Sequence, residues 1–290
     1  MYNLGQRFRK NYYRYLGFQY KPQLVLAMSS GHSRTTASLE LFLAGLFPPL
    51  NTPLEWNSNL NWNPIQFKCD TGSESNKLFF SIWCPSFKKV FDAYLDSKYV
   101  QNLEGKYRKD YAYLSNSTGL NVQSLAQLSQ LYFGLTSEKE WGFELPTWTN
   151  EFYPSYLQEA AIDNYKTLIA TPEHNQLYGG PLLKNIIDHL NNTITDSLEN
   201  PKIIVYSGHE INIVGLLSAM KVYNPHVPPY GACIVLELYD NDAVKVLYDD
   251  YTSSDFKELK IEGCESPCPF SAFVNLLKAH LPSDENTCMV

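Results

Sequence analysis

Two short polar turns in this chain carry side chains that could hold a phosphate group and help to cleave its ester. Residues 29–34 (SSGHSR) end in Arg34, and residues 207–210 (SGHE) contain His209 and Glu210. A planar guanidinium suits phosphate or carboxylate oxygens, and an imidazole can hydrogen-bond an anionic oxygen. A neighbouring carboxyl can act as a general acid when its pKa is raised. Together, the three side chains suit a phosphate ester, because two hold the phosphoryl oxygens and one protonates the leaving group.

Structural roles for the same residues remain open from the sequence alone. An arginine at the start of a helix usually lies on the surface, and His209-Glu210 could form a helix start, where acidic residues are favoured. His32 lies in the first turn, but a turn histidine is more often exposed than catalytic. The remaining histidines have no local partner pattern and are interpreted as structural; they are His174, His189, His226 and His280.

Each of the two polar turns lies between a predicted strand and a predicted helix. Residues 23–28 (QLVLAM) predict a buried strand, and residues 35–46 predict a helix that ends before two prolines. Residues 202–206 (KIIVY) predict a second strand, followed by a helix over about 211–223. In open α/β sheets the ligand crevice lies at the carboxyl ends of the strands, so we expect the two turns to converge there.

The other segments complete an α/β plan with a helical insertion. Residues 4–16 carry an apolar stripe every fourth residue, which predicts an amphipathic helix, and residues 181–195 predict another. Residues 86–135 have helical spacing, whereas residues 51–85 look irregular. Two alternating strands are predicted near the carboxyl end, at 232–239 and 243–249.

Composition excludes several classes of protein. Of 290 residues, 44% are hydrophobic and 18% are charged, which excludes an intrinsically disordered chain. No apolar run approaches the ~18 residues of a membrane-spanning helix. The net charge of −7 makes nucleic acid a poor partner, yet residues 1–39 contain six of the 23 Lys and Arg residues and no acid. That local excess of positive charge favours an anion site.

Cysteines and sequons point to an oxidising compartment, although the first residues do not. The spacing of the six cysteines fits no zinc site, and Asn116 and Asn191 begin possible glycosylation sequons. Residues 1–20 are too polar for a secretory signal peptide.

Several blocks are similar to those of a known family. Ser29-Ser-x-x-Ser-Arg34-Thr, followed by LAGLFPP (43–49), resembles the S-x-x-D-R-T…LAGLFPP block of the histidine acid phosphatases, and Tyr206-Ser-Gly-His209-Glu210 resembles their Y-S-A-H-D block. Further matches, in family order, are NLNWNPI (59–65), LPTWTN (145–150), LYGGPLL (177–183), YNPHVPPYGACIVLELY (223–239) and GCESPCP (263–269). The chain looks most like the insect venom-type branch.

The resemblance implies a fold and a chemistry. It implies a phosphoglycerate-mutase-like α/β/α sandwich formed by residues 1–65 and 172–290, with a mostly helical cap at 66–171. It implies hydrolysis of phosphate monoesters in acid through a phosphohistidine, without a metal or other cofactor. Arg34 and His209 would bind the phosphate, and Glu210, which replaces the Asp of much of the family, would be the proton donor.

The resemblance also implies the pairing of four cysteines and the surroundings of the protein. It implies Cys84–Cys288 and Cys264–Cys268 disulfides and leaves Cys69 and Cys233 unassigned. A small phosphomonoester or phosphate would be the partner, a homodimer is possible, and the protein would be secreted or lysosomal.

The chain departs from the family pattern at the nucleophile. No R-H-G-x-R block, which carries the attacking histidine and two phosphate-binding arginines, occurs in the 290 residues. The acid before the cradling arginine is replaced by Ser33, and His32 lies in a different turn from the nucleophile. The family places R-H-G-x-R on a central first strand, whose loss would leave buried backbone groups unpaired at roughly 1–3 kcal/mol each. We therefore expect an incomplete version of a longer phosphatase that is nearly inactive alone. The alternatives are a non-catalytic secreted protein that binds phosphate or a partner and, with less support, a phosphotransferase or mutase.

Overall fold

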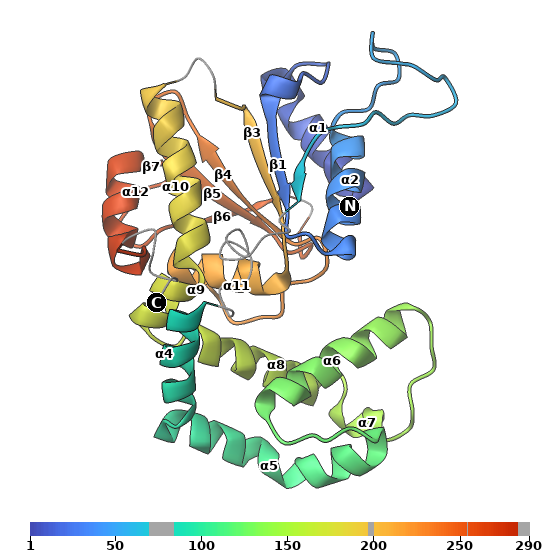
Figure 1. The fold of residues 1–290 in the computed structure, drawn as a ribbon, viewed down its shortest axis with the longest axis vertical. Helices are drawn as coiled ribbons and strands as arrows, with labels where there is room; N and C mark the ends of the chain where they lie inside the picture. Colours follow the sequence, from blue (N-terminus) through green and yellow to red (C-terminus); the bar gives the residue numbers. More distant parts are fainter. Residues whose placement is uncertain (70–83, 197–199, 254, 284–290) are drawn as a thin grey trace. The chain divides into compact units, whose positions relative to one another are not determined.

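The computed structural model describes residues 1–69, 84–196, 200–253 and 255–283 (Figure 1). The chain divides into two compact units, each built from three segments. The first, called the sheet unit, comprises Met1–Ser81, Pro181–Ile213 and Pro229–Leu276. The second, called the helical unit, comprises Ile82–Gly180, Val214–Pro228 and Leu277–Val290.

A parallel sheet in the order β2-β1-β3 organises the sheet unit. Its strands are β1 (Val25–Ser29), β2 (Lys68–Cys69) and β3 (Ile203–Ser207). β1 and β3 pair in register from Val25 opposite Ile203 to Ser29 opposite Ser207. Both strands therefore end at the same level, and the turns that follow them leave the sheet side by side.

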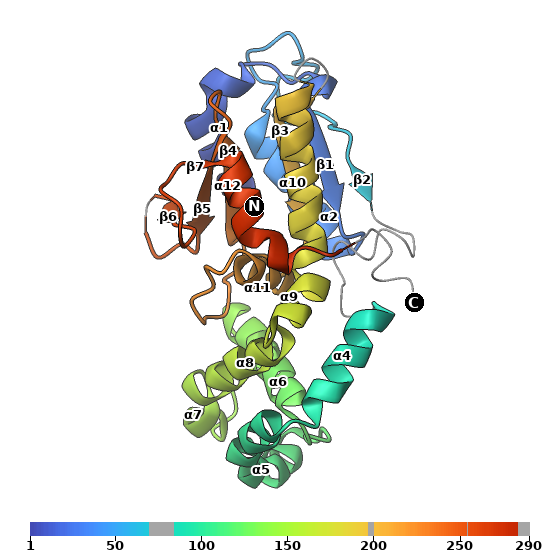
Figure 2. The ribbon, with the colours of Figure 1, turned by 90° about the vertical axis from the view of Figure 1, so that its left-hand side faces the viewer.

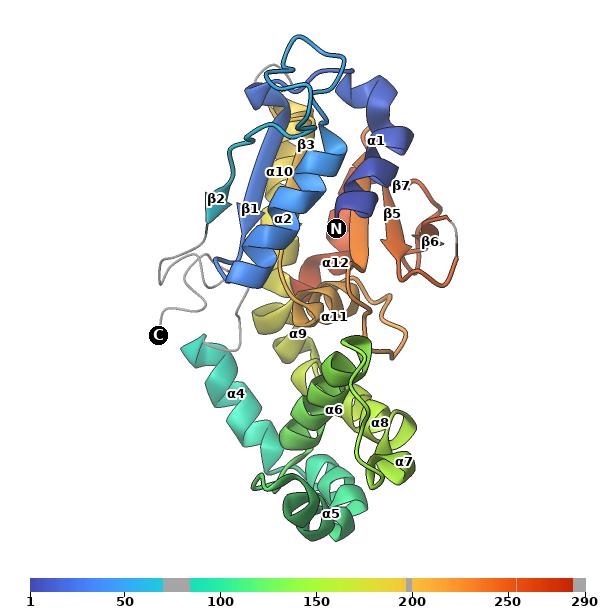
Figure 3. The ribbon, with the colours of Figure 1, turned by 90° about the vertical axis from the view of Figure 1, so that its right-hand side faces the viewer.

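Helices cover both faces of this sheet. Figure 3 shows α2 (Ser33–Leu46) in front of the parallel strands and α1 (Tyr2–Leu16) beside it, in front of the antiparallel strands described below, and Figure 2 shows α10 (Gly180–Thr195) and α12 (Phe270–Leu277) on the opposite side. α1 and α2 pack closely because each has a glycine at the crossing. A Cβ added at Gly5 would lie 2.1 Å from the Phe42 carbonyl oxygen, so only glycine fits there.

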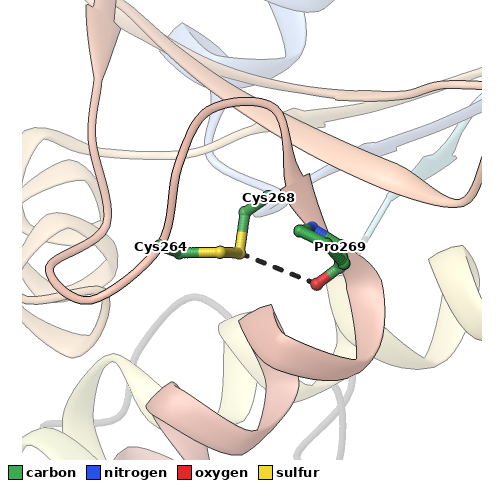
Figure 4. Close-up of a disulfide and its surroundings, with 3 residues drawn as sticks. All are labelled: Cys264, Cys268 and Pro269. Atoms are coloured by element: carbon green, nitrogen blue, oxygen red, sulfur yellow. Dashed lines mark hydrogen bonds between the residues drawn. A yellow bond between two sulfur atoms is a disulfide. The ribbon is translucent and has the colours of Figure 1, made fainter.

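An antiparallel sheet of four strands completes the sheet unit. It consists of β4 (Cys233–Leu238), β5 (Ala243–Asp249), β6 (Lys257–Leu259) and β7 (Cys268–Pro269), with β5 paired to the other three. The Cys264–Cys268 disulfide implied by the resemblance is present and closes the loop before α12 (Figure 4). In the implied Cys84–Cys288 bridge, Cys288 lies outside the described residues.

Among the described residues of the sheet unit, β3 and β4 each have an unpaired edge. Within the described residues, β3 pairs only with β1, and β4 pairs only with β5. Every residue of β3 and β4 is partly exposed, whereas six of the seven residues of β5 are buried. Val205 of β3 and Val235 of β4 nevertheless pack against the same core cluster, which α1 and α2 build around Leu4, Phe8, Leu39 and Leu43.

The helical unit contains α4 (Pro85–Leu95), α5 (Lys98–Thr118), α6 (Leu125–Glu140), α7 (Thr149–Phe152), α8 (Ser155–Leu168) and α9 (Pro172–Tyr178). Its core is rich in leucine, alanine and aromatic rings, including the fully buried Tyr107, Leu128 and Leu157. Nowhere in the described residues is a helix long and apolar enough to cross a membrane.

The predicted mixed α/β class is confirmed. The four predicted strands are present as β1, β3, β4 and β5, and the predicted helices at 4–16, 35–46 and 181–195 are α1, α2 and α10. The segment predicted to be irregular contains the short β2. The helix expected over 211–223 is α11 (Glu210–Ala219), and it ends early because Lys221 adopts a left-handed backbone conformation with φ of 60°.

Candidate active site

The candidate site lies at the carboxyl ends of β1 and β3, where each strand is followed by a turn and a helix. After β1, a turn leads to α2, and Arg34 lies in the first turn of that helix. After β3, His209 directly precedes α11, and Glu210 is the first residue of α11. The Ser30 N–H donates to the Ser207 carbonyl oxygen at 3.0 Å, which joins the two turns. Both helices begin at this edge, so their partially positive N-terminal ends favour an anion here.

Arg34 and His209 are brought into direct contact. Nη2 of Arg34 lies 3.1 Å from Nδ1 of His209. A guanidinium has only donors, so Nδ1 must accept this hydrogen bond. The ring proton of a neutral imidazole then resides on Nε2, which lies 2.9 Å from the Ser30 hydroxyl and donates to it. The geometry therefore favours one neutral tautomer of His209.

A chain of buried hydroxyls supports this tautomer. The Thr35 hydroxyl donates to the His32 carbonyl oxygen at 2.9 Å, so it can accept from Ser30, whose Oγ lies 2.9 Å away. The Ser30 hydroxyl proton is thereby directed toward Thr35, and its oxygen is left to accept from His209. Ser30 and Thr35 are only 3% and 4% exposed, so water does not compete for these bonds. The backbone N–H of His209 donates to Asn212 Oδ1 at 2.8 Å, which fixes the turn from the other side.

The pKa values of the two acid–base groups shift toward their neutral forms. Burial, the Arg34 charge and His32 together lower the pKa of His209 from an ordinary value near 6.5 to about 4. Burial raises the pKa of Glu210, although its backbone hydrogen bond and Arg34 oppose this shift. At mildly acidic pH the site therefore offers a permanent cation, a neutral imidazole and a carboxyl that retains its proton more readily than an exposed one.

The contact between Arg34 and His209 is what an arriving anion would have to displace. An anionic oxygen would accept from the guanidinium in place of Nδ1. His209 would then have to bind a proton at Nδ1 to donate to the same anion. In the tautomer assigned above, an anion held by both side chains would therefore be accompanied by proton uptake at Nδ1.

Sequence reasoning placed Arg34, His209 and Glu210 at one edge, and the structure brings the three together. It also brings His32 to the site, since its ring lies 5.2 Å from that of His209. Ser30 and Thr35 had not been singled out. Both stand in the block quoted for the resemblance, as its serine and its threonine, but no role had been assigned to either residue.

The other residues singled out earlier lie elsewhere in the fold. Ser33, which replaces the family acid, is exposed at the start of α2. Cys69 has an exposed free thiol 3.9 Å from the Thr36 hydroxyl, and Cys233 is a free, partly buried thiol in β4. The two sequon residues, Asn116 on α5 and Asn191 on α10, are exposed.

Comparisons with known proteins agree with the resemblance. Residues 1–249 match the model of the histidine phosphatase superfamily (branch 2). The chain is 36% identical over 289 residues to venom acid phosphatase Acph-1 of Apis mellifera, covering 98% of this chain and 74% of that protein. It is 31% identical to the lysosomal acid phosphatase of Rattus norvegicus, covering 98% of this chain and 68% of the relative.

The fold matches at greater distance. The phytase from Citrobacter braakii superposes with a TM-score of 0.69 over 100% of this chain and 87% of the phytase, at 17% identity. Identity at this level establishes a shared fold and nothing finer.

Proposed function

This chain belongs to branch 2 of the histidine phosphatase superfamily, and we propose that it forms the phosphate-binding and proton-donating part of an acid phosphatase that hydrolyses phosphate monoesters. The contact between Arg34 and His209, with Glu210 as the next residue, carries this proposal. Arg34 and His209 hold the phosphoryl oxygens. Glu210, with its raised pKa, gives a proton to the leaving oxygen.

The covalent step needs a nucleophile from an R-H-G-x-R segment, a motif that the 290 residues do not contain. An imidazole nitrogen of that segment attacks phosphorus as the bond to the ester oxygen breaks, and that oxygen takes the proton of Glu210. The Glu210 carboxylate then accepts a proton from water as the water oxygen attacks the phosphohistidine. The phosphorus–nitrogen bond breaks as the oxygen–phosphorus bond forms, phosphate is released, and the free histidine and the protonated Glu210 are regenerated, so no further reactant is required.

The unpaired edges of β3 and β4 are where we place such a segment. Five residues of β3 and six of β4 are partly exposed although most are apolar, and both strands pack on the α1–α2 core. An extended segment between them would pair with both edges and cover these side chains. Because β3 ends at the Ser207 turn, the end of such a segment would lie next to His209.

Turnover by the polypeptide of these 290 residues tests the proposal. Loss of a covalent nucleophile lowers rates by several orders of magnitude, so we expect almost no hydrolysis of p-nitrophenyl phosphate. A longer polypeptide that also carries R-H-G-x-R should hydrolyse it and form an acid-labile phosphohistidine, and Glu210→Gln in that form should slow the step that expels the alcohol. Normal turnover by the 290-residue chain would refute the role assigned to the segment.

A second candidate function follows from the same motif absence: a non-catalytic protein that binds phosphate or a phosphate-bearing partner through Arg34 and His209. Calorimetry with inorganic phosphate and with vanadate measures this binding directly. A cooperative thermal melt with saturable phosphate binding and no turnover in any longer form would favour this candidate. No heat of binding and no cooperative melt would eliminate it.

We also propose that the protein follows the secretory route, to the outside or to lysosomes. One relative is named a venom enzyme and another a lysosomal enzyme, and the Cys264–Cys268 disulfide needs an oxidising compartment. In that compartment the exposed Asn116 and Asn191 would be open to glycosylation. Mass spectrometry before and after glycosidase treatment tests these two sites, and light scattering tests the possible homodimer.

A further inference from the structure

A cavity in the helical unit has the size and chemistry of a second binding site. Its volume is about 490 Å³, within the range of small-molecule sites. Its lining comes from the ends of four helices and the loops after two of them, and it comprises Tyr94, Tyr99, Lys166, Ile169, Ala170, Ser218, Lys221, Tyr223 and Pro225. All nine residues belong to the helical unit, whereas Arg34 and His209 belong to the sheet unit.

Three tyrosines give the cavity flat aromatic walls. The rings of Tyr94 and Tyr99 lie 6.4 Å apart and are tilted by 37°. Tyr94 also packs against the buried His174, whose ring lies 5.0 Å away. The Tyr223 hydroxyl donates to the His226 carbonyl oxygen at 2.7 Å, so the position of this side chain is fixed. Such walls favour a flat aromatic or apolar body.

The charge lining the cavity is positive. No acidic side chain is among the described residues of its wall. Lys166 is partly balanced, because its Nζ lies 2.9 Å from Asp163 Oδ1. Lys221 has no ion-pair partner among the described residues. Burial lowers the pKa of His280, and the nearby positive charge of Lys221 lowers it further. Lys221 therefore leaves one uncompensated positive charge at the wall.

The backbone of Lys221 is unusual for its residue type. Its φ of 60° lies in the left-handed region, where a residue with a long side chain is uncommon and glycine is favoured. The turn that ends α11 needs this conformation, since the N–H groups of Lys221 and Val222 donate to Ser218 and Leu217. A lysine also suits the carbonyl end of a helix, so the strain alone assigns no role. The cavity beside it supplies the second observation.

We propose that this cavity binds a small aromatic anion, with its ring against the tyrosines and its acidic group on Lys221. Carboxylates, sulfonates and phosphates share this chemistry. The acidic group lies near Lys221 and within reach of the Ser218 hydroxyl on the same helix end. The ring replaces water against Tyr94, Tyr99 and the apolar wall formed by Ile169 and Pro225.

Calorimetry with 2-naphthalenesulfonate tests the proposal on the full chain. A sulfonate is chosen because a phosphatase cannot hydrolyse it. We expect saturable binding to one site that persists in saturating inorganic phosphate. Lys221→Gly should weaken it about tenfold or more, since a hydrogen bond to a charged group is lost. Glycine tolerates the left-handed conformation, so this variant should melt at or above the parent temperature.

Two further variants of the cavity wall and one control variant outside it complete the test. Lys221→Arg keeps the charge and should stay within about threefold of the parent, and Tyr99→Ala should weaken binding by about threefold to tenfold through loss of the ring contact. Lys109→Ala, an exposed lysine of the same unit outside the cavity, is the matched control and should bind as the parent does. Absence of saturable binding, equal affinity in Lys221→Gly, or displacement by phosphate together with loss in Arg34→Ala would each overturn the proposal.

Discussion

Each unit of this protein contains a cluster of polar side chains, and the two clusters balance charge in opposite ways. In the helical unit, Asp163 accepts from the Tyr107 hydroxyl at 2.7 Å and pairs with Lys166 at 2.9 Å and Lys106 at 3.3 Å. Burial acts to raise the pKa of Asp163. Its hydrogen bonds with Lys166, Tyr107 and Lys106 outweigh burial and hold the pKa below the ordinary range. This carboxylate is charged and fully partnered.

In the sheet unit, the pKa shifts of His209 and Glu210 disfavour the charged form of each side chain. The pKa of His209 falls to about 4, mainly through burial, and burial raises that of Glu210. Groups that are kept neutral at a site with a fixed cation can gain or release a proton when a ligand arrives. Shifted pKa values in a structural network and in a ligand site can thus be told apart by whether the charged form already has its partners.

The largest expected effect is the loss of stability on removing the partnered carboxylate. Asp163→Ala leaves the fully buried Tyr107 hydroxyl without its acceptor, and we expect a loss of about 3 kcal/mol in the free energy of unfolding. The lysines are partly exposed and can regain water, which limits the cost. Urea denaturation measures it. Asp163→Asn keeps an acceptor and should lose less, and a change below about 1 kcal/mol in Asp163→Ala would contradict the structural role.

In contrast to Asp163→Ala, Arg34→Ala should weaken phosphate binding and leave the stability almost unchanged. Phosphate affinity should fall by about tenfold to a hundredfold, because a charged donor to the anion is lost. Stability should change by less than about 0.5 kcal/mol, because Arg34 is exposed and acts on His209 to lower its pKa. Calorimetry with phosphate and urea denaturation give the two quantities, and Arg34→Lys should recover part of the affinity. Unchanged affinity would remove Arg34 from the binding site.

Much of this site could be predicted from sequence, because its residues follow local patterns. A short apolar run, a polar turn and a helical repeat are readable at residues 23–46, and the same series recurs at residues 202–219. The convergence of Arg34 and His209 then follows from where parallel strands end.

The hydrogen bonds within both clusters could not be predicted in this way. The contact between Ser30 and His209 joins residues 179 positions apart and depends on the register of β1 with β3. Tyr107 and Asp163 are 56 positions apart on different helices, and neither belongs to a motif. Such pairs are set by tertiary packing, which no local pattern encodes.

Proton uptake on phosphate binding is the next expected effect. Free folded His209 is mostly neutral at pH 5.5, because its pKa is about 4. Phosphate next to Nδ1 stabilises the imidazolium, so binding should take up between about half a proton and one proton. Calorimetry in buffers with different ionisation enthalpies measures the uptake. His209→Asn should abolish most of it, whereas Glu210→Gln should retain it, and equal uptake in the parent and His209→Asn would contradict the assignment to His209.

The lowered pKa of His209 also determines how this residue contributes to the pH dependence of stability. Folded His209 binds its proton less readily than the unfolded chain, whose value lies near 6.5. Between these values the unfolded state holds more protons, so the contribution of His209 is complete above about pH 6.5 and is lost as pH falls toward 4. The difference between the parent and His209→Asn isolates this contribution, because His174 and His280 shift in the same direction. The free energy of unfolding of the parent minus that of His209→Asn should therefore decrease as pH falls, and an increase would contradict the lowered pKa.

The smallest expected effect concerns Ser30, whose hydroxyl contacts His209. Ser30→Ala removes the acceptor of the Nε2 proton, and this acceptor favours the imidazolium more than the neutral ring. The pKa of His209 should fall further, and phosphate affinity should weaken by about threefold to tenfold. NMR titration of the ring gives the first quantity and calorimetry the second. Ser129→Ala removes a buried serine hydroxyl in the helical unit and should leave both unchanged, so a purely structural effect of losing a buried hydroxyl would alter both variants alike.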